Sequence, residues 1–231
     1  MKNLVKVVVL LVVLSVMLPL TTHATSLVGT TWESNGFTFQ RQVNIPGVTN
    51  LVTNSWTGEF STQVRGDDGQ LMNGGEWFPA FCVDPGQPAQ IGGELVVEAI
   101  APGQKAGGLQ AAWLIDNFYD NATSHAQLAA LQIAIWEVVV DTDGNYDVSG
   151  GNFKIWGGSQ DALSYAGSYL ESMPTCFDVD SLNSNYMIGL HPSKQDLIVK
   201  TGNPVPEPST LLLLGSGMLG AVAIKRKRTK K

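Results

Sequence analysis

The chain has 231 residues, with 14 Lys and Arg, 20 Asp and Glu, and a formal net charge of −6. The basic residues gather at the two ends, so residues 25–207 hold six of them against all twenty acidic residues, a formal charge of −14. A body this acidic repels phosphate backbones, which argues against nucleic acid as a partner. Residues 25–207 are numerous enough for one domain with a substantial core.

A secretory signal peptide is indicated at residues 1–24. Two lysines in the first six residues precede an uncharged, mostly apolar run from Val7 to Leu20, and small or polar residues follow up to Ala24. This order of charged, apolar and small-residue segments is typical of an export signal, and we expect cleavage after Ala24. A permanent N-terminal anchor is the alternative, which Pro19 near the end of the run disfavours.

From about residue 27 to residue 100 the sequence favours β-strands separated by turns. The segment FTFQRQV (37–43) alternates Phe37, Phe39 and Arg41 with polar neighbours. The segment GEFSTQVRG (58–66) ends in a Gly-Asp-Asp-Gly turn, and ELVVEAI (94–100) is predicted to be one further strand. Two later strands are predicted near residues 186–190 and 196–200.

Three helices are predicted between these groups of strands. The first covers GLQAAWLIDNFYD (108–120). The second begins at Ser124, where Ser-x-x-Gln forms a capping box, and its apolar stripe recurs every three or four residues. A third is predicted over residues 160–172. The stripe of the second helix consists of Leu128, Leu131, Ile135 and Val138.

The predicted fold class is α+β, with a β-barrel or sandwich-like body and an inserted subdomain of two or three helices. We expect one extracellular domain over residues 25–203, once both ends of the chain are set aside as processing signals.

Two segments carry candidate chemistry. Cys82 follows Phe81 at the end of a predicted strand, and Gln132 lies on the second helix, bordering its apolar stripe. Phe81-Cys82-Val83 and the run Leu-Gln-Ile-Ala-Ile-Trp at 131–136 resemble the two signatures of bacterial thioester domains, in which a Cys follows an aromatic residue and a Gln lies in Thr-Gln-x-Ala-hydrophobic-Trp. The departure is Leu131, where that family usually has Thr.

The resemblance implies an internal thioester between the Cys82 thiol and the Gln132 carboxamide. Proximity imposed by the fold would make an unactivated amide react, and Phe81, Ile135 and Trp136 are expected to shield the bond from water. An amine on a surface protein or matrix component would then take the acyl group and remain covalently attached. Such a protein reacts once and is not an enzyme. The chemistry needs no cofactor and no metal.

Several alternatives stay open at this point. In an oxidising compartment a Cys82–Cys176 disulfide is the strongest rival, and with it a non-covalent structural or biofilm-matrix protein. A Cys–His hydrolase would need a histidine partner, and the body offers His125 and His191, neither in a recognisable signature. The loop from Asp141 to Asp147 has carboxylates at calcium-loop spacing but lacks the Gly and Glu of an EF-hand, so a solvated turn is favoured.

The C-terminal tail has three parts over residues 204–231. The proline-containing motif at 205–210 includes Pro206-Glu207-Pro208, an apolar run follows at 211–224, and six basic residues lie at 225–231. The apolar run spans about 21 Å as a helix, short of a ~30 Å hydrocarbon core, which suits a transient transmembrane helix.

This tail resembles the PEP-CTERM sorting signal, with Pro206, Glu207 and Pro208 at its namesake tripeptide. The resemblance implies a precursor inserted transiently in the inner membrane and cleaved by an exosortase. The mature protein is then expected at the cell surface or in the extracellular matrix. An ordinary C-terminal membrane anchor is the alternative.

Overall fold

The computed structural model describes residues 25–45 and 49–202. The expected signal peptide (1–24) and the whole sorting signal (204–231), including the membrane helix expected there, lie outside these residues. Within the described part of the chain, no helix is both long enough and apolar enough to cross a membrane.

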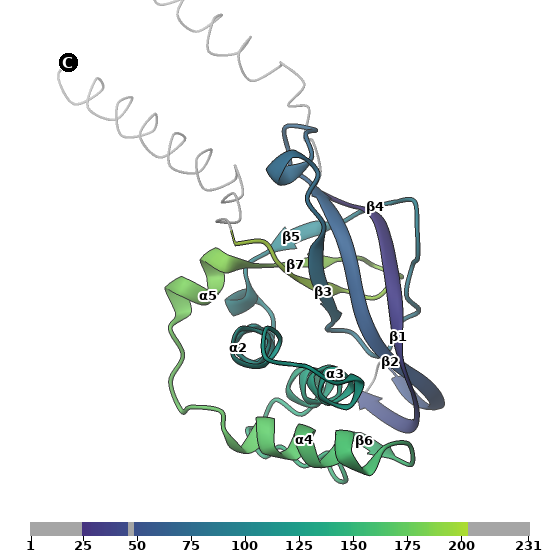
Figure 1. The fold of residues 1–231 in the computed structure, drawn as a ribbon. Helices are drawn as coiled ribbons and strands as arrows, with labels where there is room; N and C mark the ends of the chain where they lie inside the picture. Colours follow the sequence, from purple (N-terminus) through teal and green to yellow (C-terminus); the bar gives the residue numbers. More distant parts are fainter. Residues whose placement is uncertain (1–24, 46–48, 203–231) are drawn as a thin grey trace, which may run out of the picture.

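One antiparallel sheet of eight strands forms the body of the molecule (Figure 1). Seven strands follow the order β4-β1-β2-β3-β8-β7-β5, and β6 pairs with β1 beside this path. The predicted strands at 37–43 and 58–66 are parts of the long hairpin β1–β2. The strands are β1 (Ser26–Ile45), β2 (Thr49–Arg65), β3 (Phe78–Cys82), β4 (Glu94–Val96), β5 (Glu98–Ile100), β6 (Phe153–Trp156), β7 (Tyr186–Leu190) and β8 (Leu197–Lys200).

The segment 94–100 closes this sheet into a near-barrel. It was predicted to be one strand, but it divides at Val97 into β4, which pairs with β1, and β5, which pairs with β7. These are the two edges of the sheet, so neighbouring residues of one segment bind both. The Val97 N–H donates to the Thr25 carbonyl (2.9 Å) at the seam. An edge bound in this way is no longer open to pairing with other chains.

Four α-helices lie within the described residues, against the two or three expected. The additional helix is α5, whose seven residues bury only Leu182 and therefore carry no apolar periodicity to detect. Two short 3-10 turns, Met72–Gly74 and Pro102–Gln104, complete the secondary structure. The α-helices are α2 (Gly108–Phe118), α3 (His125–Val140), α4 (Gln160–Glu171) and α5 (Val179–Asn185).

Helix α3 is buried on nearly all sides, which corrects the expectation of a one-sided apolar stripe. Every residue from Ala129 to Val138 is buried, whereas Leu128, the first residue of that stripe, is partly exposed. The helix packs between α2, α4 and the β1–β2 hairpin (Figure 1). Gln132 is therefore a core residue and not one that borders the surface.

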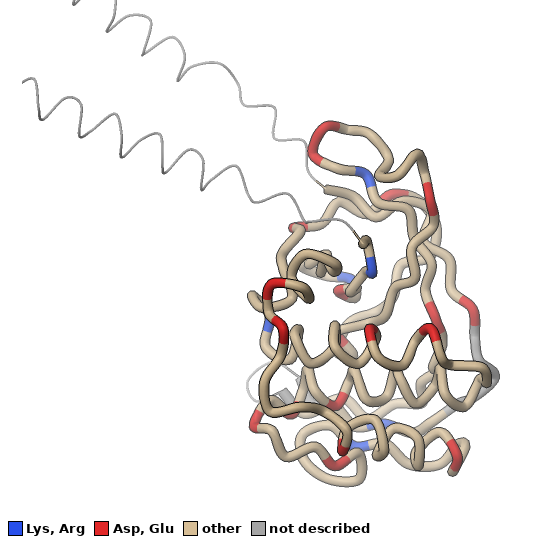
Figure 2. The backbone as a smooth tube through the Cα atoms, turned by 60° about the vertical axis from the view of Figure 1, so that its left-hand side comes forward, with Lys and Arg blue, Asp and Glu red and all other residues tan. Residues whose placement is uncertain are grey.

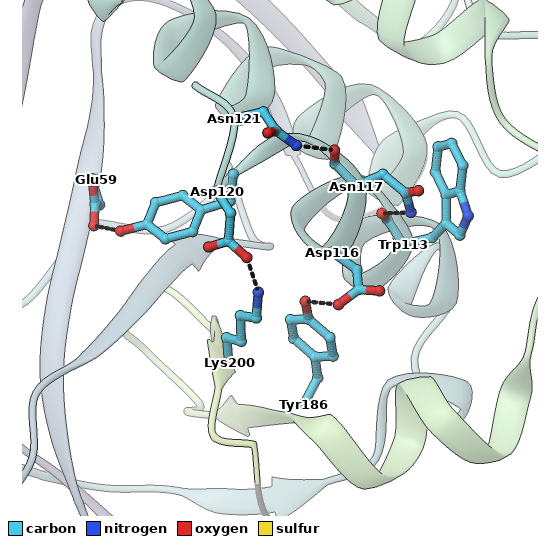
Figure 3. A network of polar contacts seen from close by, with 9 residues as sticks. Glu59, Trp113, Asp116, Asn117, Asp120, Asn121, Tyr186 and Lys200 are labelled. Carbon is cyan, nitrogen blue, oxygen red and sulfur yellow. Dashed lines mark hydrogen bonds and ion pairs between the residues drawn. The ribbon is translucent and has the colours of Figure 1, made fainter. Parts of the chain in front are cut away.

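The end of α2 is fastened to the barrel by polar contacts (Figure 3). Asp116 accepts a hydrogen bond from the Tyr186 hydroxyl of β7 (3.0 Å), and Asp120 pairs with Lys200 of β8 (2.8 Å). The Tyr119 hydroxyl donates to Glu59 of β2. Because these contacts reach three strands of the sheet that contains β3, they fix α2 against one face of that sheet.

The capping box of α3 gives a direct test of its predicted start. The Ser124 hydroxyl accepts from the Gln127 N–H (3.3 Å) and the Gln127 side chain accepts from the Ser124 N–H (3.1 Å). Ser124→Ala should lower the free energy of unfolding by about 1 kcal/mol. Denaturant unfolding measures this, with Ser164→Ala, at an exposed interior position of α4, as the matched control. Equal losses in the two variants would contradict the cap assignment.

Candidate functional site

The fold brings Cys82 and Gln132 into direct contact, although they lie 50 positions apart. The Cys82 backbone N–H donates to Gln132 Oε1 (3.0 Å), and Gln132 Nε2 donates to the Cys82 carbonyl (2.9 Å). Both residues are almost fully buried, with exposed fractions of 1% and 0%. Both polar atoms of the Gln132 carboxamide are thus held by the backbone N–H and carbonyl of Cys82.

The pattern of the sheet explains why a carboxamide is needed there. The pairing of β2 with β3 ends at Phe60 and Ala80, and the Val83 N–H donates to the Asp196 carbonyl on the β8 side (2.9 Å). Because successive residues of a strand direct their peptide groups to opposite sides, those of Cys82 face away from β8, where β2 has already separated. The Gln132 side chain supplies the donor and acceptor of the missing strand.

The Cys82 thiol is held in its neutral form. Burial raises the pKa of Cys82 to about 12, although the Trp136 indole, the Asp84 N–H (3.4 Å from Sγ) and the charge of Arg41 act in the opposite direction. The Trp136 Nε1–H has the largest effect of these three, although its contact with the thiol falls outside the geometry of a standard hydrogen bond. The site therefore positions the sulfur and shields it from water, but little of the thiol is ionised at neutral pH.

A pocket of about 310 Å³ opens beside this pair. Of the three residues expected to shield a thioester, Trp136 lines the pocket, whereas Phe81 and Ile135 are fully buried outside its wall. Phe81 packs edge-on against Tyr119, with ring centroids 5.6 Å apart. The pocket is lined by Trp32, Arg41, Asn54, Ser55, Trp56, Gly58, Phe60, Cys82, Gln87, Pro88, Ala89, Ile91, Gln132, Trp136 and Gln195.

Arg41 is a site residue that the sequence analysis did not identify. Its side chain is 6% exposed and lies over the Trp136 ring, with Cζ 4.6 Å from the centroid. Burial lowers the pKa of Arg41, while Cys82 and Asp84 favour its charged form. The signal was present in the sequence, because Arg41 falls between Phe39 and Val43 on the core-facing positions of its strand.

The other cysteine and the histidines lie away from this site. Cys176 is an exposed free thiol in the segment between α4 and α5, and Cys82 is a buried free thiol, so the structure does not contain the alternative Cys82–Cys176 disulfide. His125 is the exposed first residue of α3, and the ring of His191 accepts a hydrogen bond from the Ser193 N–H (3.1 Å). Neither histidine lines the pocket that contains Cys82.

The carboxylates of the loop after α3 bind the loop's own backbone. Asp141 accepts from the N–H groups of Asn152 and Phe153 (both 2.8 Å), and Asp147 accepts from the Ser149 N–H (2.9 Å). No group of three or more His, Cys, Asp or Glu in the described residues is arranged to hold a metal ion. These carboxylates therefore shape the turn.

Comparisons with known proteins identify one motif in this chain. Residues 204–228 match the PEP-CTERM protein-sorting motif. No curated protein matches the chain. Among solved structures, the N-terminal domain of the Streptococcus pyogenes pilus tip adhesin Cpa is similar at 14% sequence identity and a TM-score of 0.38, covering 72% of this chain and 94% of that one. The sorting motif indicates an exported protein that is anchored transiently in the membrane and processed by an exosortase.

Glu137 of α3, which contacts the loop that follows this helix, should make the free energy of unfolding depend on pH. Burial and the nearby carboxylates, chiefly Asp141 and Asp147, raise its pKa to about 8, whereas its Oε1 accepts from the Asp147 N–H (2.7 Å). A carboxyl whose folded-state pKa is raised stabilises the fold below its unfolded pKa of about 4.3, and this contribution is lost as pH rises towards 8.

We therefore expect Glu137→Gln to be progressively more stable than the wild type between pH 5 and pH 8.5. The glutamine keeps the acceptor oxygen and cannot ionise. Urea unfolding at several pH values measures the difference, and Glu171→Gln on the exposed face of α4 is the control. A stability difference that does not change with pH would contradict the assignment of a raised pKa.

Proposed function

We propose that this exported protein attaches covalently to amine-bearing partners through a thioester between Cys82 and Gln132. The observation that carries the proposal is the buried carboxamide held on both of its polar atoms by the peptide unit of Cys82, at the edge of a pocket. The resemblance of the two segments to thioester domains supports it.

Formation of the thioester balances within the site. Cys82 Sγ attacks the Gln132 Cδ, an S–C bond forms, the C–N bond breaks, and Nε2 leaves as ammonia with the thiol proton. Gln132 Oε1 gains negative charge on the way, and the Cys82 N–H already donates to it, in the manner of an oxyanion hole. Because the pKa of the thiol is high, the rate depends on proximity more than on a reactive thiolate.

The second step links the partner. An amine nitrogen attacks the Gln132 Cδ, the S–C bond breaks, and Cys82 Sγ takes a proton from the amine. The product is a stable amide and a free thiol, so the protein reacts once and does not turn over. Trp136 forms part of the pocket wall and reduces the access of water to the acyl group.

The sorting motif supports a location outside the cell for this reaction. After exosortase processing, we propose that the mature protein lies at the cell surface or in the extracellular matrix, where a surface protein or matrix component supplies the amine. The acidic body shown by the red segments in Figure 2 helps to keep it soluble there.

The intact mass of the mature protein tests the proposed bond. We expect a mass lower than the sequence mass by one ammonia. Exposure to methylamine should restore one free thiol at Cys82 and leave a methylated amide on Gln132. Peptide mapping locates both changes. Cys176→Ser should lose ammonia and react with methylamine as the wild type does, because Cys176 is exposed and outside the site.

Two variants complete this test. Cys82→Ser and Gln132→Ala should both retain the full sequence mass and form no adduct. Gln132→Ala should also be less stable by about 1–3 kcal/mol or more, since it leaves two buried peptide groups of Cys82 without partners, whereas Cys82→Ser keeps Gln132 in place. A wild type with unaltered mass and no methylamine adduct would overturn the covalent function and leave non-covalent adhesion in its place.

The sorting motif gives a separate test in the native host. Replacing Pro206-Glu207-Pro208 with alanines should trap the precursor in the inner membrane, because the processing enzyme loses its recognition peptide while the apolar run remains. Fractionation and mass spectrometry of the C-terminus measure the outcome. A mature wild-type protein that still ends at Lys231 would contradict processing and favour an ordinary membrane anchor.

A further inference from the structure

Most of the unpaired buried polar atoms in the described residues gather in the pocket beside Cys82. Five buried side-chain nitrogen and oxygen atoms in the described residues have no hydrogen-bond partner. Four of them belong to residues that line this pocket: Arg41 Nε and Nη1, Trp136 Nε1 and Gln195 Oε1. Folded proteins satisfy nearly all such groups, so a concentration of exceptions at one pocket points to a ligand that satisfies them.

The charge of Arg41 identifies the chemistry of that ligand. Arg41 is buried, with 6% of the residue exposed, and its guanidinium forms no ion pair with any described carboxylate. Asp84 is the negative group that acts on it at neutral pH, because the Cys82 thiol is neutral there. Once the sulfur of Cys82 is in a thioester it cannot carry charge, which leaves Asp84, whose Oδ1 already accepts from the Gly86 N–H (3.0 Å).

The other two unpaired atoms of the pocket belong to Trp136 and Gln195. Trp136 Nε1 is a further donor beside the Arg41 guanidinium, and Gln195 Oε1 is an acceptor that a primary amine can satisfy. The pocket therefore offers donors and a positive charge to an anion, and an acceptor to an amine, next to the acyl carbon. Its volume of about 310 Å³ is at the lower end for ligand pockets, which suits a short molecule or the end of a side chain.

We propose that the pocket selects primary amines that carry a carboxylate within a few bonds, with Arg41 binding the carboxylate and Gln195 accepting from the amine. This proposal rests on the proposed thioester, and it names the class of nucleophile: a short amino acid, or a lysine with an acidic group beside it.

A pair of matched amines tests the selection in the mature protein. β-Alanine and β-alaninamide have the same length and differ in the carboxylate. We expect β-alanine to form adducts at least about tenfold faster, per concentration of unprotonated amine, because a charge-assisted hydrogen bond is worth that factor or more. Intact mass spectrometry at several concentrations gives the rates. Equal rates for the two amines in the wild type would overturn the proposal.

Variants assign the effect to Arg41. Arg41→Gln should bring the two rates, compared within that variant, to within about twofold of each other. Arg65→Gln, which removes an arginine that pairs with Glu94 outside the pocket, should keep the preference. A preference that survives in Arg41→Gln would also overturn the proposal. If Arg41→Gln does not fold, Arg41→Lys, which keeps the charge without the planar fork, should show a reduced preference.

Binding without reaction separates this proposal from the thioester itself. The Cys82→Ser variant cannot form the thioester, and titration with β-alanine, followed through the NMR signal of the Trp136 indole N–H, should show saturable binding that Arg41→Gln removes. If Cys82→Ser binds β-alanine but the wild-type mass is unaltered, only the covalent function is ruled out. If the wild type forms the thioester but Cys82→Ser binds no β-alanine and the wild type shows no preference for it, only the pocket proposal is ruled out.

Discussion

The two hydrogen bonds between the Gln132 side chain and the Cys82 peptide are the contact on which the rest of this structure depends. They join α3, the central helix, to the strand β3 at the point where β2 separates from it. Without them, a buried N–H and a buried carbonyl would have no partner, at a cost of about 1–3 kcal/mol for each group. The same contact that completes the sheet also brings the Gln132 carboxamide to the residue that carries the buried thiol.

This double role links stability and reaction. A thioester would add a covalent cross-link between positions 50 apart. By restricting the unfolded chain, such a cross-link raises the free energy of unfolding by about 4 kcal/mol. Attack by an amine removes that cross-link. The link between β3 and α3 would then depend again on non-covalent contacts, with Cys82 again a buried thiol.

The sequence predicted local features well and spatial ones less well. The capping box at Ser124 and the strand ending at Cys82 are set by neighbouring residues, and both are confirmed. The depth of Gln132 was missed because a one-sided stripe was predicted for this helix, although residues 129–140 are apolar on nearly all sides, as is typical of a buried helix. The division of the segment 94–100 was also missed, because both halves have the same alternation and only their distant partners differ. Arg41 was missed because a basic residue in an alternating strand is usually directed to solvent.

The strand β8 connects the candidate site to the point where the chain leaves the barrel. Leu197, at its start, pairs with Cys82, and the chain leaves the barrel at its other end, after Lys200. The matched sorting motif begins at residue 204, soon after that exit. The candidate site and this exit are therefore at opposite ends of one short strand, roughly 13 Å long. A pull on the chain at the exit would act directly on the strand that pairs with Cys82.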